Sequence, residues 1–579
     1  MSKTVASQLA ETLAAAGVKR IYGVVGDSLN ALTDSLRQRK DIEWVHTRHE
    51  EVAAFAAGAE AHLTGALAVC AGSCGPGNLH LINGLFDCHR SRVPVLAIAA
   101  QIPSSEIGSG YFQETHPESL FKDCSYYCEL VSTPKQMPRV LEIGIRTAIS
   151  KRGVSVVVIP GDVALEAALS ARPPTLEELR FTQPTITPAS DEIERVASLL
   201  NDANRVTLLC GTGCGGAREQ VLALASKLEA PIVSSLRGKE YLEGDNPYYV
   251  GLTGLIGYSS GYGAINDCDV LLMLGTDFPY RQFYPESRST RIVQIDIRPE
   301  NIGRRTRVDH GLVGDVGAAL DALLPKLTQK TDARHATSAV EHYRNVRKEL
   351  DELAVGTPGH SPLHPQQVAK AFSDKASEDA VFTCDVGLPT VWAARYAQMN
   401  GGGRRLIGSF NHGSMANALA QAIGAQKAFP KRQVISFSGD GGFSMLMGDF
   451  LSLAQLGLPV KVVVFNNGSL GFVELEQRAG GFLDADTSLQ NPSFAAIARA
   501  AGIHGISLVD PKDVDAGVAE ALATDGPVLI DAVVNRNELA MPPKITAALA
   551  SGFTLFMVKA LLNGRADEIV ELARANLWR

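Results

Sequence analysis

Residues 433–467 constrain the fold more than any other stretch, because two short apolar runs there end in polar clusters. The first run, Val434 to Phe437, ends in Gly439-Asp440-Gly441-Gly442, and the second, Val460 to Phe465, ends in Asn466-Asn467. The pattern predicts two buried parallel strands joined by one crossover helix. A right-handed crossover places both clusters at the carboxyl edge of one sheet, where open α/β sheets bind ligands.

The residue types in these clusters point to a magnesium-bound diphosphate. Asp440 offers a carboxylate and Asn467 an amide oxygen, and both are hard oxygen donors that suit Mg2+. The neighbouring glycines let a diphosphate approach the backbone amides. Either cluster alone is also typical of an ordinary turn at the end of a strand. The two together, at the ends of strands joined by one helix, are more specific.

The length of the chain and its alternating patterns predict several α/β domains. A chain of 579 residues is long for a single core. The proline-rich residues 172–188 interrupt the periodicity and are predicted to form a linker. The final 40 or so residues carry two helical patterns with no strand between them. The predicted strands elsewhere are Ile21–Val25, Ala66–Ala71, Val93–Ala100, Val154–Pro160, Arg205–Cys210, Pro231–Ser235, Val270–Leu274, Arg291–Asp296 and Ala380–Asp385.

Charge and cysteine usage exclude several classes of protein. The 54 basic and 62 acidic residues give a net charge of -8, which argues against nucleic acid as a partner. Nine cysteines without a CxxC pair argue against a disulfide framework and a zinc site, and fit a reduced cytosolic setting. Glu11 interrupts the apolar part of the first 20 residues, which predicts a helix and no signal peptide. No apolar run approaches the ~18 residues that a membrane span needs.

The end of the chain predicts an amphipathic helix. Ala566, Ile569, Val570, Ala573 and Leu577 fall on one helical face, and Trp578 follows them. Such a helix suits a lipid interface. A helix packed on the protein itself is the alternative.

The chain resembles the thiamine diphosphate-dependent enzymes of the pyruvate oxidase and acetolactate synthase type over essentially its whole length. Besides the two clusters, residues 47–61, 71–90 and 408–418 carry the resemblance. It implies an α/β fold of three successive domains with mainly parallel sheets, followed by a helical tail. The implied parts are an N-terminal domain for the thiamine pyrimidine (1–180), a central FAD domain (190–330), a thiamine diphosphate and magnesium domain (360–535) and a membrane-binding tail (536–579).

The resemblance assigns roles at the thiamine site. Glu50 matches the glutamate that hydrogen-bonds N1' of the aminopyrimidine, although Glu50 and Glu51 also suit a helix start through the helix dipole. The family pairs the first and third domains across subunits, which implies a homodimer at least. Gly413, Ser414 and Met415 are assigned to the aminopyrimidine, and Asp440, Gly441, Gly442 and Asn467 to the diphosphate. Asp440, Asn467 and Ser469 are the implied Mg2+ ligands, and His80, Phe112, Gln113, Phe472 and Glu476 are placed beside the reacting atoms.

The central domain carries the implied FAD site. A predicted strand ending at Cys210 leads into the glycine-rich residues 211–216, which alone is a weak signal for a dinucleotide. Asp296 ends another strand and could accept hydrogen bonds from a ribose or adenine. Similarity to flavin-contacting loops adds Thr253, Gly254, Leu255, Ile256, Thr276, Asp277, Phe278, Pro279 and Tyr280.

The branch of the family that this chain resembles most implies oxidative decarboxylation of pyruvate to acetate and CO2. Electrons would pass through FAD to a membrane quinone such as ubiquinone. The same branch implies a dimer or tetramer, in the cytoplasm at the inner face of the cell membrane, that binds phospholipid through its tail. Two alternatives stay open: condensation of two 2-ketoacids, as in acetolactate synthase, and a nucleotide-binding scaffold without catalysis. Intact Glu50, Asp440 and Asn467 argue against the scaffold.

Overall fold

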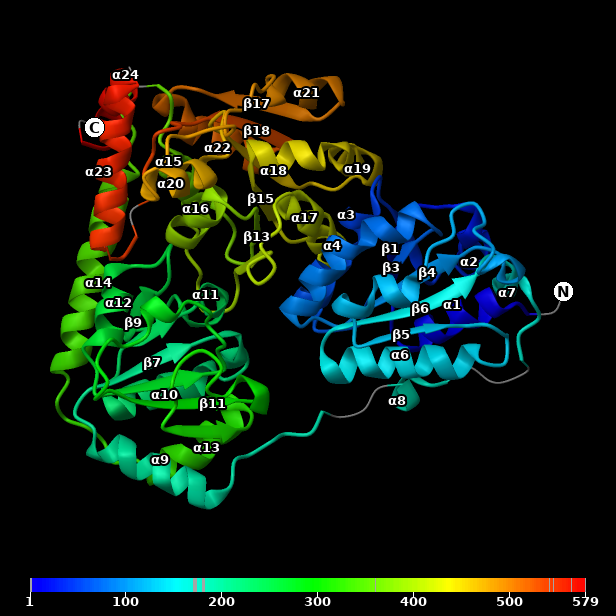
Figure 1. Ribbon diagram of the computed structural model, residues 1–579, viewed down its shortest axis with the longest axis horizontal. Coiled ribbons are helices and arrows are strands. Elements are labelled where there is room, and N and C mark those ends of the chain that lie inside the picture. Colours follow the sequence, from blue (N-terminus) through cyan, green and yellow to red (C-terminus); the bar gives the residue numbers. More distant parts are fainter. Residues whose placement is uncertain are drawn as a thin grey trace.

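The computed structural model describes residues 3–169, 174–179, 183–359, 361–540, 542–544, 546–563 and 565–577. Within these ranges the strands form three sheets, each of six parallel strands. Figure 1 shows the first unit at the right, the second at the lower left and the third across the top. The predicted class, three α/β units with parallel sheets followed by a helical end, is confirmed.

The first sheet has the strand order β2-β1-β3-β4-β6-β5. Its central strand β4 sends alternate residues into two separate cores, Val95, Ala97 and Ala99 into one and Leu96, Ile98 and Ala100 into the other. Burial on both faces explains why such strands are continuous apolar runs. The strands are β1 (Arg20–Gly23), β2 (Glu43–His46), β3 (Ala68–Gly72), β4 (Val95–Gln101), β5 (Tyr127–Leu130) and β6 (Val154–Pro160), and the main helices are α1 (Val5–Ala15), α2 (Asn30–Arg39), α3 (Glu50–Thr64), α4 (Pro76–Ser91) and α6 (Met137–Lys151).

The second sheet has the order β12-β11-β10-β7-β8-β9, and the long helix α14 (Arg334–Leu353) leads from it to the third unit. The predicted linker 172–188 lies partly outside the described residues and contains the short helix α8 (Leu176–Leu179). The strands are β7 (Val206–Cys210), β8 (Ile232–Ser234), β9 (Tyr249–Leu252), β10 (Val270–Leu274), β11 (Arg291–Asp296) and β12 (His310–Val313), and the helices are α9 (Ser190–Asp202), α10 (Arg218–Leu228), α11 (Leu236–Leu242), α12 (Ser259–Asn266) and α13 (Val316–Leu323).

The third sheet has the order β14-β13-β15-β16-β18-β17. Its strands are β13 (Val381–Cys384), β14 (Arg405–Gly408), β15 (Val434–Gly439), β16 (Lys461–Asn466), β17 (His504–Leu508) and β18 (Val528–Val533), and its helices are α15 (Pro365–Lys375), α16 (Leu388–Tyr396), α17 (Asn417–Ala428), α18 (Asp440–Met445), α19 (Phe450–Leu456), α20 (Gly471–Ala479), α21 (Phe494–Ala500) and α22 (Val514–Ala523).

The prediction of one crossover helix between β15 and β16 is wrong, because the segment forms two short helices, α18 and α19. The break contains Asp449, a buried carboxylate that accepts hydrogen bonds from the Arg48 N–H (2.8 Å) and the Ser452 hydroxyl (2.7 Å). Arg48 belongs to the first unit, two residues before Glu50. The interruption therefore makes a contact between units that a continuous helix would not provide.

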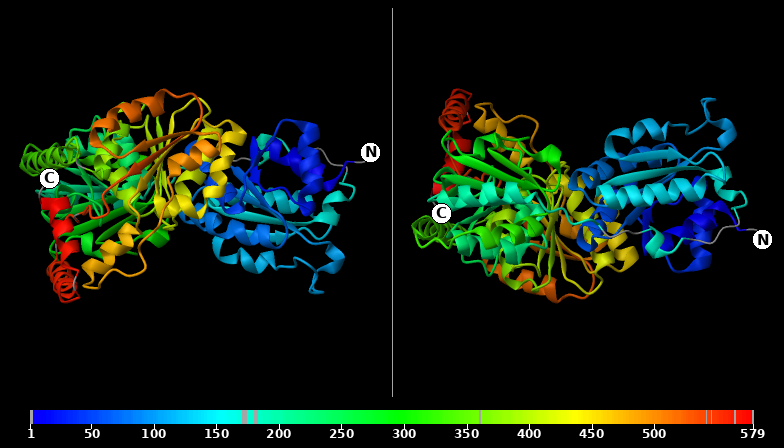
Figure 2. Two further views of the ribbon diagram at one scale, coloured as in Figure 1. Left: turned by 90° about the horizontal axis from the view of Figure 1, so that it is seen from above. Right: turned by 90° about the horizontal axis from the view of Figure 1, so that it is seen from below.

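The first and third units pack through helices α3 and α17, which Figure 2 shows at the junction of the blue and yellow parts of the chain. A side chain at Gly424 would place its Cβ only 2.0 Å from the carbonyl oxygen of Ala56. The helices thus meet at their backbones, and position 424 requires glycine. Polar bonds join the second unit to its neighbours, including Glu240 to Arg405 (2.8 Å) and Arg298 to the Lys151 carbonyl (2.7 Å).

The tail consists of helices α23 (Ala547–Leu562) and α24 (Ala566–Leu577), and α23 packs on α20 of the third unit (Figure 1). A Cβ at Gly552 would lie 1.9 Å from the Ala479 carbonyl oxygen. Phe556 is buried, with the Arg478 guanidinium 5.3 Å from its ring centre. Arg565 donates to Asp484 across the same contact (2.8 Å). Among the described residues, no helix is long and apolar enough to span a membrane.

The exposed apolar residues of the tail lie mainly on α23, whereas the sequence pointed to α24. Helix α24 buries Leu572 and Ala575 and leaves Val570 exposed, and Trp578 lies outside the described residues. The outer face of α23 carries an apolar stripe at helical spacing. The stripe consists of Leu555, Val558, Leu561 and Leu562, which are exposed by 47%, 46%, 57% and 80%.

Candidate active site

The predicted diphosphate clusters lie where the strand order of the third sheet reverses. From β13 the chain runs first to β14 on one side and then, through β15, to β16 on the other. Asp385 follows β13 and Asp440 follows β15, so both carboxylates stand at this reversal. Open α/β sheets bind their ligands in the crevice at such a point.

Asp440 is buried and held in one orientation. Its Oδ1 accepts the N–H of Gly441 (2.9 Å), and its Oδ2 accepts the N–H of Gly468 and the side-chain amide of Asn491, both at 2.7 Å. Burial raises the pKa of Asp440, and these hydrogen bonds oppose the rise. Oδ1 accepts only one of these bonds, so it retains a lone pair for a cation, whereas Oδ2 already accepts two.

Asn467 and Ser469 form a fixed turn after β16. The Asn467 Oδ1 accepts the N–H of Ser469 (3.0 Å), and the Ser469 hydroxyl donates to the buried carboxylate of Glu474 on α20. The N–H of Leu470 donates to the Thr487 carbonyl (2.8 Å). The predicted metal ligands therefore sit on a turn that the protein already holds in place.

The segment Gly413–Met415 lies against the Asp440 cluster. Gly413 has a φ of +88°, which favours glycine. The Ser414 hydroxyl accepts from the Asn83 side chain of α4 (2.8 Å). A Cβ at Gly441 would lie 3.3 Å from Cε of Met415. The structure thus brings the predicted pyrimidine segment and the predicted diphosphate cluster together.

Asp385 also lies in this site, although the sequence did not identify it as a site residue. Its Oδ1 accepts the N–H of Ala418 (2.9 Å), and its Oδ2 accepts the N–H of Gly439 (3.3 Å). A Cβ at Gly442 would lie 2.3 Å from that Oδ2. Burial raises the pKa of Asp385 to about 7. The carboxylate therefore joins the start of α17 to the Asp440 cluster, and its position at the end of an apolar run was the available signal.

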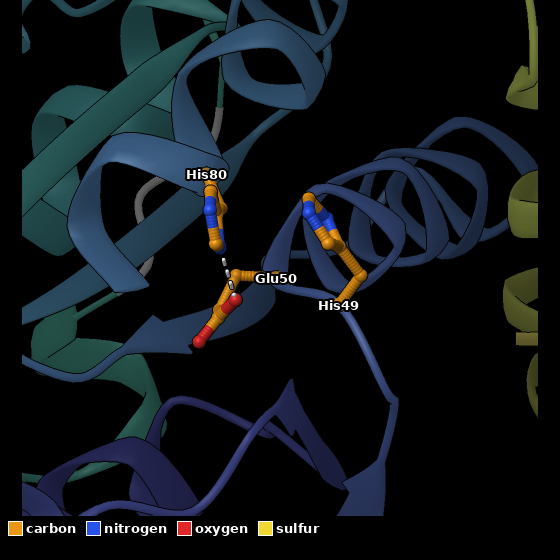
Figure 3. A group of neighbouring side chains, drawn as sticks. All are labelled: His49, Glu50 and His80. Atoms are coloured by element: carbon orange, nitrogen blue, oxygen red, sulfur yellow. Dashed lines mark hydrogen bonds and ion pairs between the residues drawn. The ribbon is translucent and has the colours of Figure 1, made fainter. Parts of the chain in front are cut away.

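Glu50 begins α3 and is 7% exposed. Figure 3 shows its carboxylate and His80 pointing toward one another, and His80 Nδ1 lies 3.0 Å from Glu50 Oε2. The His49 ring stacks on that of His80 with 4.3 Å between ring centres. The three side chains place ligand atoms within 4.8 Å of one another. However, His49 Nδ1 already accepts the Glu51 N–H at the start of α3 (3.2 Å), so the group suits hydrogen bonding better than a metal.

The other residues predicted beside the reacting atoms divide between the two units. Phe112 is 78% exposed, and Gln113, with a φ of +64°, accepts from the Cys74 thiol just before α4 (3.4 Å). Phe472 and Glu476 lie on α20 of the third unit. Among the described residues, no hydrogen bond links Glu50, His80 or Gln113 to residues 408–491. Within the described part of one chain, these three residues therefore make no hydrogen bond to the Asp440 cluster, although α4 reaches the Gly413–Met415 segment through Asn83.

The third-unit half fits a magnesium-bound diphosphate. Asp440 and Asn467 supply hard oxygen atoms, and the turn at Ser469 adds backbone carbonyls. Gly441 has no room for a side chain, because a Cβ there would meet Leu470 at 2.8 Å as well as Met415. Position 441 therefore requires glycine, and the fit to the metal rests on the oxygen atoms of Asp440, Asn467 and the Ser469 turn, to which a diphosphate would add its own.

The glycine-rich run 211–216 serves the packing of the second sheet. A Cβ at Gly211 would lie 2.5 Å from the Gly275 carbonyl oxygen, and one at Gly213 would lie 2.6 Å from the Gly275 Cα. The loops after β7 and β10 thus touch at their backbones, at the point where this sheet also reverses its strand order. Close packing accounts for these two glycines without a nucleotide.

Of the loops predicted to contact FAD, residues 253–256 follow the edge strand β9, and residues 276–280 follow β10 at this reversal point. Thr253 is buried, and its hydroxyl has no hydrogen-bond partner among the described residues. Gly254, with a φ of +104°, faces the Phe278 ring, and Tyr280 is 42% exposed. Leu255 and Ile256 continue the first loop, whereas Thr276 and Pro279 belong to the loop after β10. The two loops meet where Gly254 faces Phe278, and an orphaned hydroxyl on one loop with an exposed aromatic ring on the other fits a bound ligand with polar and flat parts.

Two carboxylates of the second unit are engaged with the protein. Asp277 receives two hydrogen bonds from Arg305, at 2.7 and 3.1 Å. Asp296 is buried, which raises its pKa, and accepts from the Arg298 N–H (2.9 Å) and the Asn301 side chain (3.2 Å). Asp296 therefore holds the loop after β11 and retains lone pairs for a ribose or adenine.

Comparison with known proteins decides the family. Three thiamine pyrophosphate enzyme models match: the N-terminal TPP binding domain at residues 3–120, the central domain at 193–323 and the C-terminal TPP binding domain at 385–532. The chain belongs to the thiamine pyrophosphate enzymes. The putative thiamine pyrophosphate-containing protein YdaP of Bacillus subtilis (strain 168) is 37% identical over 574 residues, which cover 99% of each chain.

Relatives of this thiamine pyrophosphate enzyme include proteins with two different names. Pyruvate oxidase of Lactiplantibacillus plantarum is 31% identical over 540 residues, 90% of this chain and 87% of that protein. The acetolactate synthase large subunit of Parasynechococcus marenigrum is 31% identical over 556 residues, 93% of this chain and 88% of that protein. The resemblance that the sequence suggested is thus confirmed at the level of the family, and identity favours neither reaction.

Proposed function

We propose that this enzyme oxidises pyruvate to acetate and CO2 with thiamine diphosphate, Mg2+ and FAD, and passes two electrons to a membrane quinone. One pyruvate, one water and one quinone give one acetate, one CO2 and one quinol. The α23 stripe is the observation that favours oxidation over condensation. An exposed apolar helix face suits a protein that binds lipid and reduces a lipid-soluble acceptor. The enzyme would work at the inner face of the cell membrane.

Residues of the third unit would hold the thiamine cofactor. Asp440, Asn467 and the Ser469 carbonyl bind Mg2+, and Gly441 and Gly442 admit the diphosphate. The Gly413–Met415 segment holds the aminopyrimidine, and the Met415 side chain lies close enough to Gly441 to act as a wedge. When bound, thiamine diphosphate supplies the nucleophile and the electron sink for loss of CO2.

Glu50 would exchange a proton with N1' of the aminopyrimidine. Its carboxylate is buried, and His80 lies within hydrogen-bond distance, which fixes its orientation. Glu50 makes no hydrogen bond to the Asp440 cluster of its own chain among the described residues, which supports a second copy that would bring its Glu50 to that cluster. The active unit is therefore at least a homodimer, in which each interface builds complete sites.

FAD would occupy the reversal point of the second sheet. The unpaired Thr253 hydroxyl, the side-chain-free Gly254 and the carboxylate of Asp296 support its binding there. Phe112, Gln113, Phe472, Glu476 and His80 would line the space between thiamine and flavin. The exposed Phe112 ring would exclude water from that space when the second copy covers it.

Anaerobic addition of pyruvate with thiamine diphosphate and Mg2+ tests the proposal through the flavin absorbance. Bleaching without formation of acetolactate is expected. Glu50→Gln should slow flavin reduction by about 100-fold or more, as expected for loss of a general acid-base group. Glu51→Gln is the matched control, since the glutamine can still accept the Asn83 hydrogen bond. Unchanged bleaching in Glu50→Gln would contradict the role of Glu50, and acetolactate without bleaching would replace oxidation by condensation.

A further inference from the structure

A ring of side-chain hydrogen bonds adjoins Asp440. The Asn491 amide donates to Asp440 Oδ2 (2.7 Å) and to Asn466 Oδ1 (3.0 Å). The Asn466 amide donates in turn to Asp531 Oδ1 on β18 (3.0 Å). Asp531 Oδ2 accepts the N–H of Phe494 (2.9 Å), three residues after Asn491. The ring thus closes on the segment from which it started.

Asn491 connects the ends of two neighbouring strands. Asp440 follows β15, and Asn466 is the last residue of β16, and these strands pair with Gly439 opposite Phe465. A single NH2 group supplies both hydrogen bonds, so it fixes the Asp440 carboxylate relative to the turn that begins at Asn467. The buried Asp531 anchors the far side of this arrangement.

The amide chemistry of Asn491 suits this place. Its NH2 group donates two hydrogen bonds and carries no charge. A carboxylate at 491 would stand beside Asp440 and repel it in a buried setting, and an aliphatic side chain would leave Asn466 Oδ1 without this donor. Partners outside the coordination shell commonly orient metal ligands in this way.

We propose that Asn491 is a positioning residue for the metal. It orients Asp440 and sets its distance from the Asn467 turn, so that Mg2+ with its diphosphate meets a preformed site. This inference rests on the proposed binding of Mg2+ and thiamine diphosphate at this edge of the sheet. Asn491 itself does not touch the metal.

The test is equilibrium binding of thiamine diphosphate to the full-length protein, titrated with Mg2+ and followed by calorimetry. Asn491→Ala should need about 10- to 100-fold more Mg2+ for half-saturation, the usual cost of losing such a partner. Excess Mg2+ should restore full binding, even though the loss of two hydrogen bonds also lowers the melting temperature of the protein without cofactor. Asn491→Ser, which keeps one donor, should give a smaller shift and replaces the alanine variant if that variant fails to fold. Gln490→Ala, at the exposed neighbouring residue, is the control and should bind as the wild type does.

Two results would overturn the inference while leaving the proposed function intact. One is an unchanged Mg2+ dependence in both Asn491 variants. The other is a loss of binding that excess Mg2+ does not restore, which would assign Asn491 a purely structural role. If the wild-type protein binds no thiamine diphosphate in the presence of Mg2+, the proposed function fails, and the inference fails with it.

Discussion

Asp87 should make the stability of this protein depend on pH. It lies on α4 where the first and third units meet, fully buried, and accepts hydrogen bonds from the Ser409 hydroxyl (2.8 Å) and the Gln421 side chain (3.2 Å). Burial raises the pKa of its carboxyl from 3.8 to about 6, despite these two bonds. The perturbation that isolates this carboxyl is Asp87→Asn.

The raised pKa of Asp87 determines that stability falls as the pH rises. Below pH 3.8 the carboxyl is protonated in both the folded and the unfolded chain, and its contribution to stability is complete. As the pH rises toward 6, the unfolded chain ionises more readily, and the folded protein loses stability. At 1.36 kcal/mol for each pKa unit, the full loss is about 3 kcal/mol, and about 2 kcal/mol of it falls between pH 4.5 and 7.5.

Urea unfolding of the protein without cofactors at pH 4.5 and 7.5 measures the effect. The free energy of unfolding of the wild type, relative to Asp87→Asn, should fall by about 2 kcal/mol between these pH values. Asp202→Asn, at an exposed position, should follow the wild type. Equal pH dependence in the wild type and Asp87→Asn would refute the argument that burial of this carboxylate dominates.

Two glycine substitutions test close backbone contacts, one between the first and third units and one between the tail and the third unit. Gly424→Ala should lower the free energy of unfolding by about 1–3 kcal/mol or more, because its methyl group would collide with the Ala56 carbonyl of α3. Gly448→Ala, with nothing within 4 Å, should have little effect, and equal melting curves for both variants would contradict the packing. Gly552→Ala should displace α23 from Ala479, so proteases should cut the tail faster and lipid vesicles should bind more protein. Unchanged cleavage and vesicle binding would disprove the α23 contact.

The parts of the fold that the sequence predicts well are strands buried on both faces. Val154–Pro160, Val270–Leu274 and Arg291–Asp296 have the predicted bounds, because continuous apolar runs are what two cores require. The six edge strands β2, β5, β9, β12, β14 and β17 were not predicted, nor was β18. Edge strands are short and often half-exposed, as the burial of β2 and β12 shows, so they carry a weak apolar signal.

The site, like the fold, was predicted where the signal is local in the sequence and missed where it depends on the tertiary fold. The Asp440 and Asn467 clusters follow strands, so their meeting at one edge could be inferred from local sequence. Asn491 lies in an irregular segment and reaches Asp440 only through the fold, and no local pattern marks it. The interruption at Asp449 has the same origin, since its partner Arg48 lies 401 residues away in the chain.

The backbone contact between α3 and α17 affects how the activity per chain would depend on protein concentration. Helices that touch at Ala56 and Gly424 leave no slack for the two units to slide or hinge against each other. In the proposed homodimer, a chain diluted to a monomer would lack the Glu50 that its partner supplies to the Asp440 cluster. Under the proposed function, turnover per chain would therefore depend on the concentration of chains, and a membrane that gathers them would raise it through the higher local concentration.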